Sequence, residues 1–480
     1  MGFFDGLKNF MNFISFFPAE NDLYGEDFDR LKEIDLRRNY RLGNQQKQLK
    51  IKEGQTDDNL RCNLIGKAIN QSVYLLVGKG VDFDLPGDNE TPEEQWLNAC
   101  WKTNKKQILL YRSAQNAGES GNGYIKIIPD GVYGRLNGKD MLFPRLINID
   151  PLWITMDTNP EDFEQVIRYN IRFNTVGPDG KERARKEIIE YHDADINDNG
   201  TPVGEGYWMI SEYYNDHTTG GKWVLMEAPI KWDYTFAPIV EWQNLISPNS
   251  IYGEPDVSDD ILELQDRLNF VASNINKIIR YHAHPKTYTI GLGKPAKESW
   301  GADQIIQFLT AGSDTKGEIA NLEMQSDLKS SLEFFDLVSK SILDNTNTVD
   351  VNNLKDKLGQ LTNFAVRVLF NDALSKMNIK RELFGDALRD LNHRLLTLGG
   401  FANTDPGEVK FPDNVLPINE QEVINIQKAE MEMGVVSKQT IALERGRDYE
   451  EEQGRMSEEQ ENNTTIGAEI LKTFEKGTQK

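Results

Sequence analysis

The chain has 480 residues, a formal net charge of −22 at pH 7 and 38% hydrophobic residues. This length suits two to four structural units with sizeable cores. No apolar run approaches the ~18–20 residues that a membrane-crossing helix needs, and the two cysteines, Cys62 and Cys100, cannot form a disulfide framework. The acidic balance argues against a protein that grips nucleic acid, since binding phosphates calls for an excess of basic residues.

Residues 1–20 form an apolar N-terminal arm. Its large apolar residues recur from Phe3 to Phe17 at roughly helical spacing, and Pro18 ends the pattern. Charged residues interrupt the stretch and no basic segment precedes it, so the arm does not fit a secretory signal. We expect the arm to dock on the protein's own assembly, with membrane contact as the alternative.

The next two regions differ in character. Residues 21–115 are predicted to be largely helical, and NAGESGNG at 116–123 predicts a turn. From about 124 to 245, short alternating or apolar runs are separated by turn sequences such as VGPDGK and HTTGGK. This pattern predicts an antiparallel meander that forms a sheet or an open barrel.

A long amphipathic helix is predicted from Pro255 to His284, roughly 45 Å at ~1.5 Å per residue. Pro255 suits a first turn, and the acidic residues Asp256, Asp259 and Asp260 favour its positive end. An unbroken heptad spacing predicts helix-on-helix packing, and the spacing leaves open whether the partner helix belongs to the same chain or to a neighbour. The residues of this seam are Val257, Ile261, Leu264, Leu268, Val271, Ile275 and Ile278.

The remaining pattern continues the mixture of helix and strand. Residues 286–325 predict a strand at TYTIG and a short helix near 302–309, and residues 327–345 predict a second long helix. A third helical segment spans about 361–398, with a slip of its apolar pattern at 378–381 that predicts a kink. The fold class expected from all of these elements is α+β.

The chain lacks the sequence patterns of common catalytic and cofactor sites. VGKG at 77–80 and GLGK at 291–294 do not have the spacing of a phosphate-binding loop. GESG at 118–121 falls short of a nucleophile elbow. His282 and His284 stand beside a helix-ending proline, which explains them without a metal. We therefore expect no catalytic residue, no resident metal and no cofactor.

One weak calcium motif is present. Asp195, Asn197, Asn199 and Gly200 match the first half of a calcium-binding loop, but Gly206 stands where the bidentate glutamate is expected. The flanking residues resemble strands rather than helices. A β-hairpin turn is the preferred interpretation, with adventitious Ca²⁺ binding as the alternative.

Three stretches together resemble a known family. NYRLGNQQKQLKI with NLIGKAINQSVYLLVGKG opens the series, and GVVSKQTIALE, with Gly434, Ser437 and Thr440, closes it. The middle stretch, APIVEWQN…YGEPDVSDDILELQDRLNFVASN, carries Leu264, Gln265, Asp266 and Asn269. In this order and spacing they resemble the portal proteins of siphophages that infect Gram-positive bacteria, over about residues 25–465. One departure is Thr362–Asn363, where many relatives have Ser–Gly at the start of the long helix.

The resemblance implies a non-enzymatic subunit of a ring, dodecameric in the virion, around a DNA channel at one capsid vertex. It implies that the chain, a late protein, occupies the host cytoplasm during assembly and then the virion. The implied partners are other copies of the chain, double-stranded DNA during packaging and ejection, the terminase large subunit, a head–tail adaptor, and the major capsid and scaffolding proteins. No membrane partner is expected.

The resemblance also implies a division of the chain. The wing would comprise residues 21–250 and the long helix and return strand at 361–418. The stem helices would be 251–284 and 327–345, with the clip at 285–326 between them. A tunnel loop at 346–360 would face DNA, the crown would span 419–465, and 466–480 would be a C-terminal tail.

A DNA conduit should make few and exchangeable phosphate contacts, which agrees with the acidic charge. In the tunnel loop the candidates are Lys355 and Lys357, with Asn347, Asn352 and Asn353 as neutral partners, and Lys277 and Arg280 are candidates lower in the channel. The alternatives are ordinary loop solubility for the lysines and compensation of the helix dipole for Lys277 and Arg280. Two other functions stay open: another head component such as an adaptor, and a DNA-processing enzyme.

Overall fold

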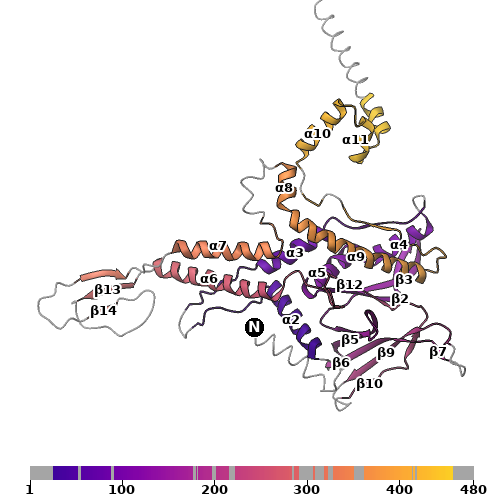
Figure 1. Ribbon diagram of the computed structural model, residues 1–480, viewed down its shortest axis with the longest axis horizontal. Coiled ribbons are helices and arrows are strands. Elements are labelled where there is room, and N and C mark those ends of the chain that lie inside the picture. The colour runs from indigo at the N-terminus through magenta and orange to yellow at the C-terminus, as the bar shows by residue number, and fades with distance from the viewer. Residues whose placement is uncertain are drawn as a thin grey trace, which may run out of the picture. The chain divides into compact units, whose positions relative to one another are not determined.

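Helices and antiparallel strands alternate in blocks along the chain, so the computed structural model has a mixed α+β fold (Figure 1). The chain divides into two compact units, unit 1 (Met1–Asn352 and Phe370–Val415) and unit 2 (Asn353–Leu369 and Leu416–Lys480). The structure describes residues 25–51, 56–87, 91–176, 180, 182–196, 202–215, 222–283, 286–290, 306–308, 318–322, 328–350, 362–412, 415–416 and 419–457.

Four helices lie at the start of the described part of unit 1, in agreement with the helical prediction for residues 21–115. Local caps explain where two of them start. The side chain of Asn63 accepts a hydrogen bond from the Gly66 amide, and Thr91 does the same for Glu94 just before a proline at the first helical position. The helices are α2 (Gly25–Arg41), α3 (Leu64–Val77), α4 (Pro92–Thr103) and α5 (Lys106–Ser120), with the short strand β1 (Asp82–Asp84) between α3 and α4.

The prediction of a turn over residues 116–123 is wrong for residues 116–120, which are helical. Helix α5 continues to Ser120, and only Gly121, in the left-handed region at φ 92°, ends it. The helix tolerates these small residues because they are buried, and because the carboxylate of Glu119 is paired with Arg38 and Arg41 of α2. A glycine-rich sequence that indicates a turn in isolation is thus held helical by tertiary contacts.

The β-rich region forms two main sheets rather than one meander. A three-stranded sheet has the order β12–β2–β3, with strands β2 (Asn122–Leu136), β3 (Lys139–Asn148) and β12 (Ile239–Gln243). A six-stranded sheet has the order β10–β9–β6–β5–β4, with β11 also paired to β9. Its strands are β4 (Ile154–Asn159), β5 (Asp162–Val176), β6 (Glu182–His192), β9 (Tyr207–Asn215), β10 (Val224–Leu225) and β11 (Ile230–Trp232).

The three-stranded sheet separates two hydrophobic cores. Because side chains alternate across a strand, Ile125 and Val240 pack into a core with helices α3, α5 and α9, whereas Tyr124 and Ile239 pack into a core with the six-stranded sheet. Gly123 is required for this packing, since a Cβ there would lie 2.1 Å from the ring of Trp242. The sheet therefore joins the helical and β-rich parts of unit 1.

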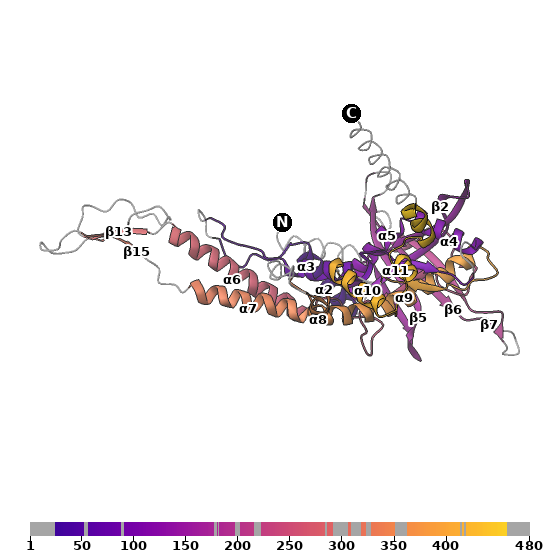
Figure 2. The same cartoon turned by 90° about the horizontal axis from the view of Figure 1, so that it is seen from above.

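Two long helices lie side by side after the sheets, as Figures 1 and 2 show. They are α6 (Asp259–Ala283) and α7 (Leu328–Asn345). The prediction that α6 starts at Pro255 is wrong, because residues 255–258 precede the first helical turn. The residues between the helices include a small sheet of order β14–β13–β15, made of β13 (Lys286–Ile290), β14 (Ile306–Phe308) and β15 (Glu318–Leu322).

The short helix predicted near 302–309 is wrong where it can be compared. Ile306–Phe308 is instead the strand β14, because it pairs in parallel with Tyr288–Ile290 of β13. Apolar runs this short do not distinguish helix from strand by their periodicity, and the pairing partner decides.

The long helix predicted over 361–398 is two helices, which fall in different units. Unit 2 contains α8 (Asn363–Leu369), and unit 1 contains α9 (Asn371–Leu398). Helix α9 runs through residues 378–381, where a kink was predicted, without interruption. The slip of the apolar pattern arises there because Lys380, a charged residue, occupies a buried position.

Two short strand pairings complete the described part of unit 1. Strand β16 (Glu408–Lys410) follows α9 and pairs antiparallel with β1, and β7 (Asp195–Ile196) pairs with β8 (Pro202–Val203). Unit 2 also contains α10 (Glu420–Glu432) and α11 (Lys438–Glu444), and residues 449–457 are helical. Ser437 begins α11 by accepting a hydrogen bond from the Thr440 amide.

Candidate functional site

The predicted seam of α6 faces the chain's own core. Ile261 and Leu268 belong to the same hydrophobic cluster as Val338 and Ile342 of α7 and several residues of α3. Val257 is buried too, although it precedes the helix. Val271 and Ile275 are also buried, whereas Leu264 and Ile278 are half-buried. The partner of this seam, which the spacing left open, thus lies within the same chain for its buried part.

The two basic residues predicted on α6 differ in their surroundings. Lys277 is exposed. The guanidinium of Arg280 lies 2.6 Å from a carboxylate oxygen of Asp58, whose side chain is only 8% exposed. Arg280 therefore holds the connection between α2 and α3 against α6, a contact that the sequence pattern did not indicate.

The segment that follows α7, residues 346–350, is bonded to α3. Asn347, one of the predicted channel residues, is exposed and sits in the left-handed region at φ 54°, which reverses the chain. The Val349 amide donates to Oε1 of Gln71 at 3.1 Å, and Asp350 forms an ion pair of 2.8 Å with Lys67. Both partners lie on α3. The other predicted loop residues, Asn352, Asn353, Lys355 and Lys357, lie outside the described residues.

A buried charge cluster joins the start of α6 to α3 and α9. A carboxylate oxygen of Asp256 lies 3.0 Å from the Lys380 ammonium, and the other oxygen lies 3.1 Å from that of Lys376. Lys380 also donates to Ser72 of α3 at 2.8 Å, and Asn244 donates to Asp256 at 3.4 Å. The side chains of Asp256 and Lys380 are 1% and 2% exposed, so water does not screen this contact.

The electrostatics of the cluster favour an ionised carboxylate. Burial alone would raise the pKa of Asp256, but the charges and hydrogen bonds of Lys380 and Lys376 outweigh it and lower the pKa to about 2. Burial lowers the pKa of Lys380, against the opposing effect of Asp256. Gly118 of α5 makes room for the cluster, because a Cβ there would lie 2.7 Å from Asp256. The role of the cluster is structural, because a substrate could reach it only if α3 and α9 separated.

The sequence interpretation of Asp256 was wrong. Asp256 was expected to stabilise the N-terminus of α6 by its charge, but it lies before the helix and pairs with lysines more than a hundred residues away in sequence. A signal was present, because Lys380 interrupts the apolar face of α9. A charged residue on an otherwise apolar face indicates a buried partner of opposite charge.

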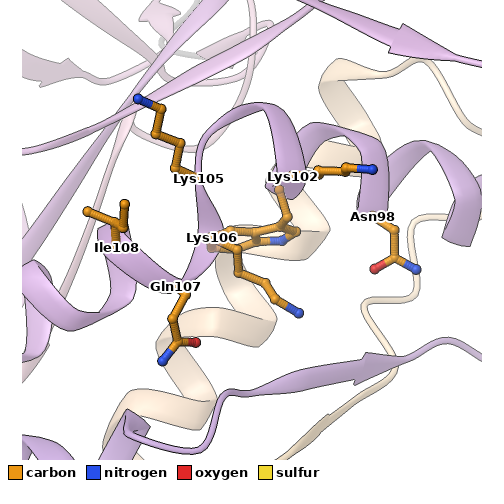
Figure 3. A pocket seen from close by; sticks show the side chains of 7 residues that line it. Asn98, Lys102, Lys105, Lys106, Gln107 and Ile108 are labelled. Carbon is orange, nitrogen blue, oxygen red and sulfur yellow. The ribbon is translucent and has the colours of Figure 1, made fainter.

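Two hollows on unit 1 are candidate pockets, and neither presents a convergent site. The first, of about 420 Å³, lies at the turn between α4 and α5 and contains three lysines. Figure 3 shows the Lys102, Lys105 and Lys106 side chains pointing in different directions, and Lys106 is paired with Asp82 at 3.3 Å. The second, of about 530 Å³ along α9 and β16, carries both signs of charge. No single ligand chemistry follows from either.

The predicted calcium motif is only partly described. Asp195 starts β7, which pairs antiparallel with β8 through Asp195↔Val203 and Ile196↔Pro202. Asn197 and Asn199 lie outside the described residues. Among the residues that the structure does describe, no group of three or more His, Cys, Asp or Glu side chains could hold a metal ion. Within the same residues, no helix has the length and apolar character to cross a membrane.

Comparison with protein families matches the chain to the family described as phage portal protein, SPP1 Gp6-like, over residues 21–465. The chain belongs to this family. No curated protein sequence matches the chain. The match covers the helices, the sheets, the α6–α7 pair and the charge cluster, so it applies to both units. Membership supports a structural role as a phage portal protein.

Proposed function

We propose that the chain is one subunit of a ring-shaped channel at a single capsid vertex, through which double-stranded DNA is packaged and ejected. The observation that carries the proposal is the family match over residues 21–465. The arrangement of α6, a small sheet and α7 supports it, because two antiparallel helices with an insert are suited to line or support a channel, whereas a small adaptor would not need them. An enzyme is the weaker alternative, since neither hollow on unit 1 gathers catalytic groups.

On this proposal the ring is a dodecamer in the virion of a siphophage that infects Gram-positive bacteria. The α6–α7 pair belongs to the stem, residues 285–326 are the clip that meets the terminase large subunit and the head–tail adaptor, and residues 419–465 are the crown. Capsid and scaffolding proteins contact the outside of the ring during assembly in the host cytoplasm.

Among the proposed DNA contacts, Lys355 and Lys357 come first, with Asn347, Asn352 and Asn353 beside them. Lys277 stays a candidate because it is exposed on α6. Arg280 is less suited to contact DNA, because its guanidinium is paired with Asp58. Replacing Lys355 and Lys357 with Glu should impair packaging while rings still form, and unchanged packaging would place the contact elsewhere.

The first test of the proposal is native mass spectrometry of the purified chain, together with negative-stain images. A closed species of about twelve copies with a central hole would support the channel. A species that stays monomeric or dimeric at high concentration would count against it. A seam variant such as Leu268→Asp is a poor probe of assembly, because Leu268 is 0% exposed inside the chain's own core and the variant would disturb folding first.

A surface variant tests the role of the stem more directly. Leu337 of α7 is 60% exposed, so Leu337→Asp should leave the chain folded. If the outer face of α7 packs against a neighbouring copy, the variant should form fewer rings than the wild type. Asp336→Asn, on the adjacent exposed position, is the matched control. A normal yield of Leu337→Asp rings would exclude this face from the subunit interface.

A further inference from the structure

An extended segment of the α2–α3 connection lies along one face of α6 (Figure 1). We call residues 56–62 the strap, and Leu64, the first residue of α3, continues its hydrogen-bond pattern. The Leu64 amide donates to Gln265 at 3.1 Å, and the Cys62 amide donates to Asn269 at 2.9 Å. Further along α6, the Leu60 amide donates to Oγ of Ser273 at 2.9 Å. The end of the strap is held at Asp58, whose carbonyl accepts from Asn276 at 3.1 Å and whose carboxylate pairs with Arg280.

The hydrogen bonds between the strap and α6 form a regular ladder, because one turn of α6 rises nearly as far as two residues of the extended strap. Four residues of helix rise ~6.0 Å, and two residues of an extended chain rise ~6.6 Å. Gln265, Asn269 and Ser273 are four residues apart, and their partners in the antiparallel strap are about two residues apart. Each helical turn therefore meets the next strap residue that faces the same way.

The ladder is polar, and this decides how the strap is held. Gln265, Asn269 and Ser273 are each 0% exposed, yet they bond to strap backbone rather than fill an apolar core. Leu60, the large apolar residue at the middle of the strap, is 44% exposed. Water can replace each of these hydrogen bonds when the strap moves away. Opening exposes little apolar surface along residues 56–61, and the added apolar exposure comes from Cys62, which packs against the edge of the helical core. The opposite face of α6 is apolar, so its separation from α7 would expose apolar surface to water.

We propose that the strap opens and closes over α6 as a unit while the two cores of unit 1 stay folded. Opening would release α6 from the α2–α3 connection and leave its apolar contacts with α7 intact. The strap is therefore an adjustable link that sets the position of α6. This inference concerns folding units within one chain and stands independently of the proposed DNA channel.

The chain carries its own probe of strap opening. Cys62 and Cys100 are its two cysteines, and both are free thiols. Cys62 lies half-buried within the strap, and Cys100 is 0% exposed in the core below the three-stranded sheet. A thiol reagent such as 4,4′-dithiodipyridine should therefore label Cys62 at a rate that reports strap opening, whereas Cys100 should resist labelling until the core unfolds.

The experiment compares labelling rates in the full-length wild type and in two strap variants. Ser273→Ala removes one rung, and Asp58→Ala removes the ion pair at the strap end. Ser273→Ala should raise the Cys62 rate about tenfold and Asp58→Ala by more than that, and both should leave the Cys100 rate unchanged. Asn274→Ala is the matched control, because Asn274 lies on α6 beside the ladder and should leave both rates unchanged.

Three outcomes would overturn the proposal. The first is a Cys62 rate in the wild type equal to that of a free thiol, because the strap would then not close over α6. The second is parallel acceleration of Cys62 and Cys100, which indicates general unfolding. The third is an unchanged Cys62 rate in both variants. Should Asp58→Ala fail to fold, as judged by circular dichroism, Ser273→Ala, which removes a single hydroxyl, still decides.

Discussion

Units 1 and 2 differ in what stabilises them. Unit 1 contains two hydrophobic cores with many fully buried side chains, such as Leu391 at 0% exposure. Among the residues of unit 2 that the structure describes, no side chain is buried. Its apolar residues face outward instead, with Phe364 at 75% and Leu443 at 64% exposure. The same chain thus combines a self-sufficient unit with helices that have apolar side chains and no core of their own.

The helices that the structure describes in unit 2 are also short. Helices α8 and α11 have 7 residues each, and α10 has 13. Isolated helices shorter than ~12–15 residues are marginal in water, and tertiary packing normally supplies their stability. For the described helices of unit 2, we therefore expect stability to come from contacts beyond those that these helices make with one another. In the proposed ring, unit 2 of a neighbouring copy is the natural source.

The largest expected effect lies in the charge cluster of unit 1. Asp256→Asn should lower the free energy of unfolding by about 3–5 kcal/mol, because it leaves Lys380 buried opposite a neutral amide. Urea unfolding followed by tryptophan fluorescence measures this effect, since all eight tryptophans lie in unit 1. Asp336→Asn, on the exposed side of α7, is the control. A loss below about 1 kcal/mol would show that the cluster can reorganise.

A truncation in the helical core comes next. Leu391→Ala should cost about 2–5 kcal/mol, because Leu391 is fully buried and its removal leaves a cavity among α3, α9 and their neighbours. The same fluorescence measurement detects the change. If the cost were as small as that of a surface substitution, the core of unit 1 would be less tightly packed than its burial indicates.

Acid should weaken the charge cluster, because it protonates the Asp256 carboxylate. The lysines bring the folded pKa of Asp256 to about 2 in spite of its burial, below the ~3.9 of an unfolded chain. The stability that the carboxylate contributes is therefore fully present above about pH 4 and is lost as the pH falls through about 2. The stability difference between wild type and Asp256→Asn should shrink by about 2 kcal/mol across this window. A constant difference would mean that the carboxylate does not titrate there.

The smallest effect is expected in unit 2. Leu443→Ala should change the stability of the unassembled chain by no more than about 0.5 kcal/mol, because Leu443 is already exposed. Hydrogen exchange of the α10 and α11 amides measures local opening in this unit. In an assembled ring, these amides should exchange more slowly than in the monomer, and Leu443→Ala should reverse part of that protection. Equal exchange rates in the ring and in the monomer would show that no neighbouring copy covers α10 and α11.

Sequence patterns predicted the sheet region, the paired long helices α6 and α7, and the family. They failed where a local signal met a tertiary contact, as three examples show. The glycines at 116–123 indicate a turn, yet α5 continues to Ser120 because Glu119 is paired with Arg38 and Arg41. The apolar run at Ile306–Phe308 is a strand because β13 pairs with it. The pattern slip on α9 is not a kink but a buried lysine.

The sequence by itself determined which residues are apolar at helical or alternating spacing, where proline and glycine end an element, and how acidic the chain is. Only the tertiary structure decided the partners: Asp256 with Lys380, Arg280 with Asp58, and the polar residues of α6 with the backbone of the strap. The physical reason is that periodicity and propensity act over a few neighbouring residues. Burial and charge pairing instead depend on which distant segments the fold brings into contact.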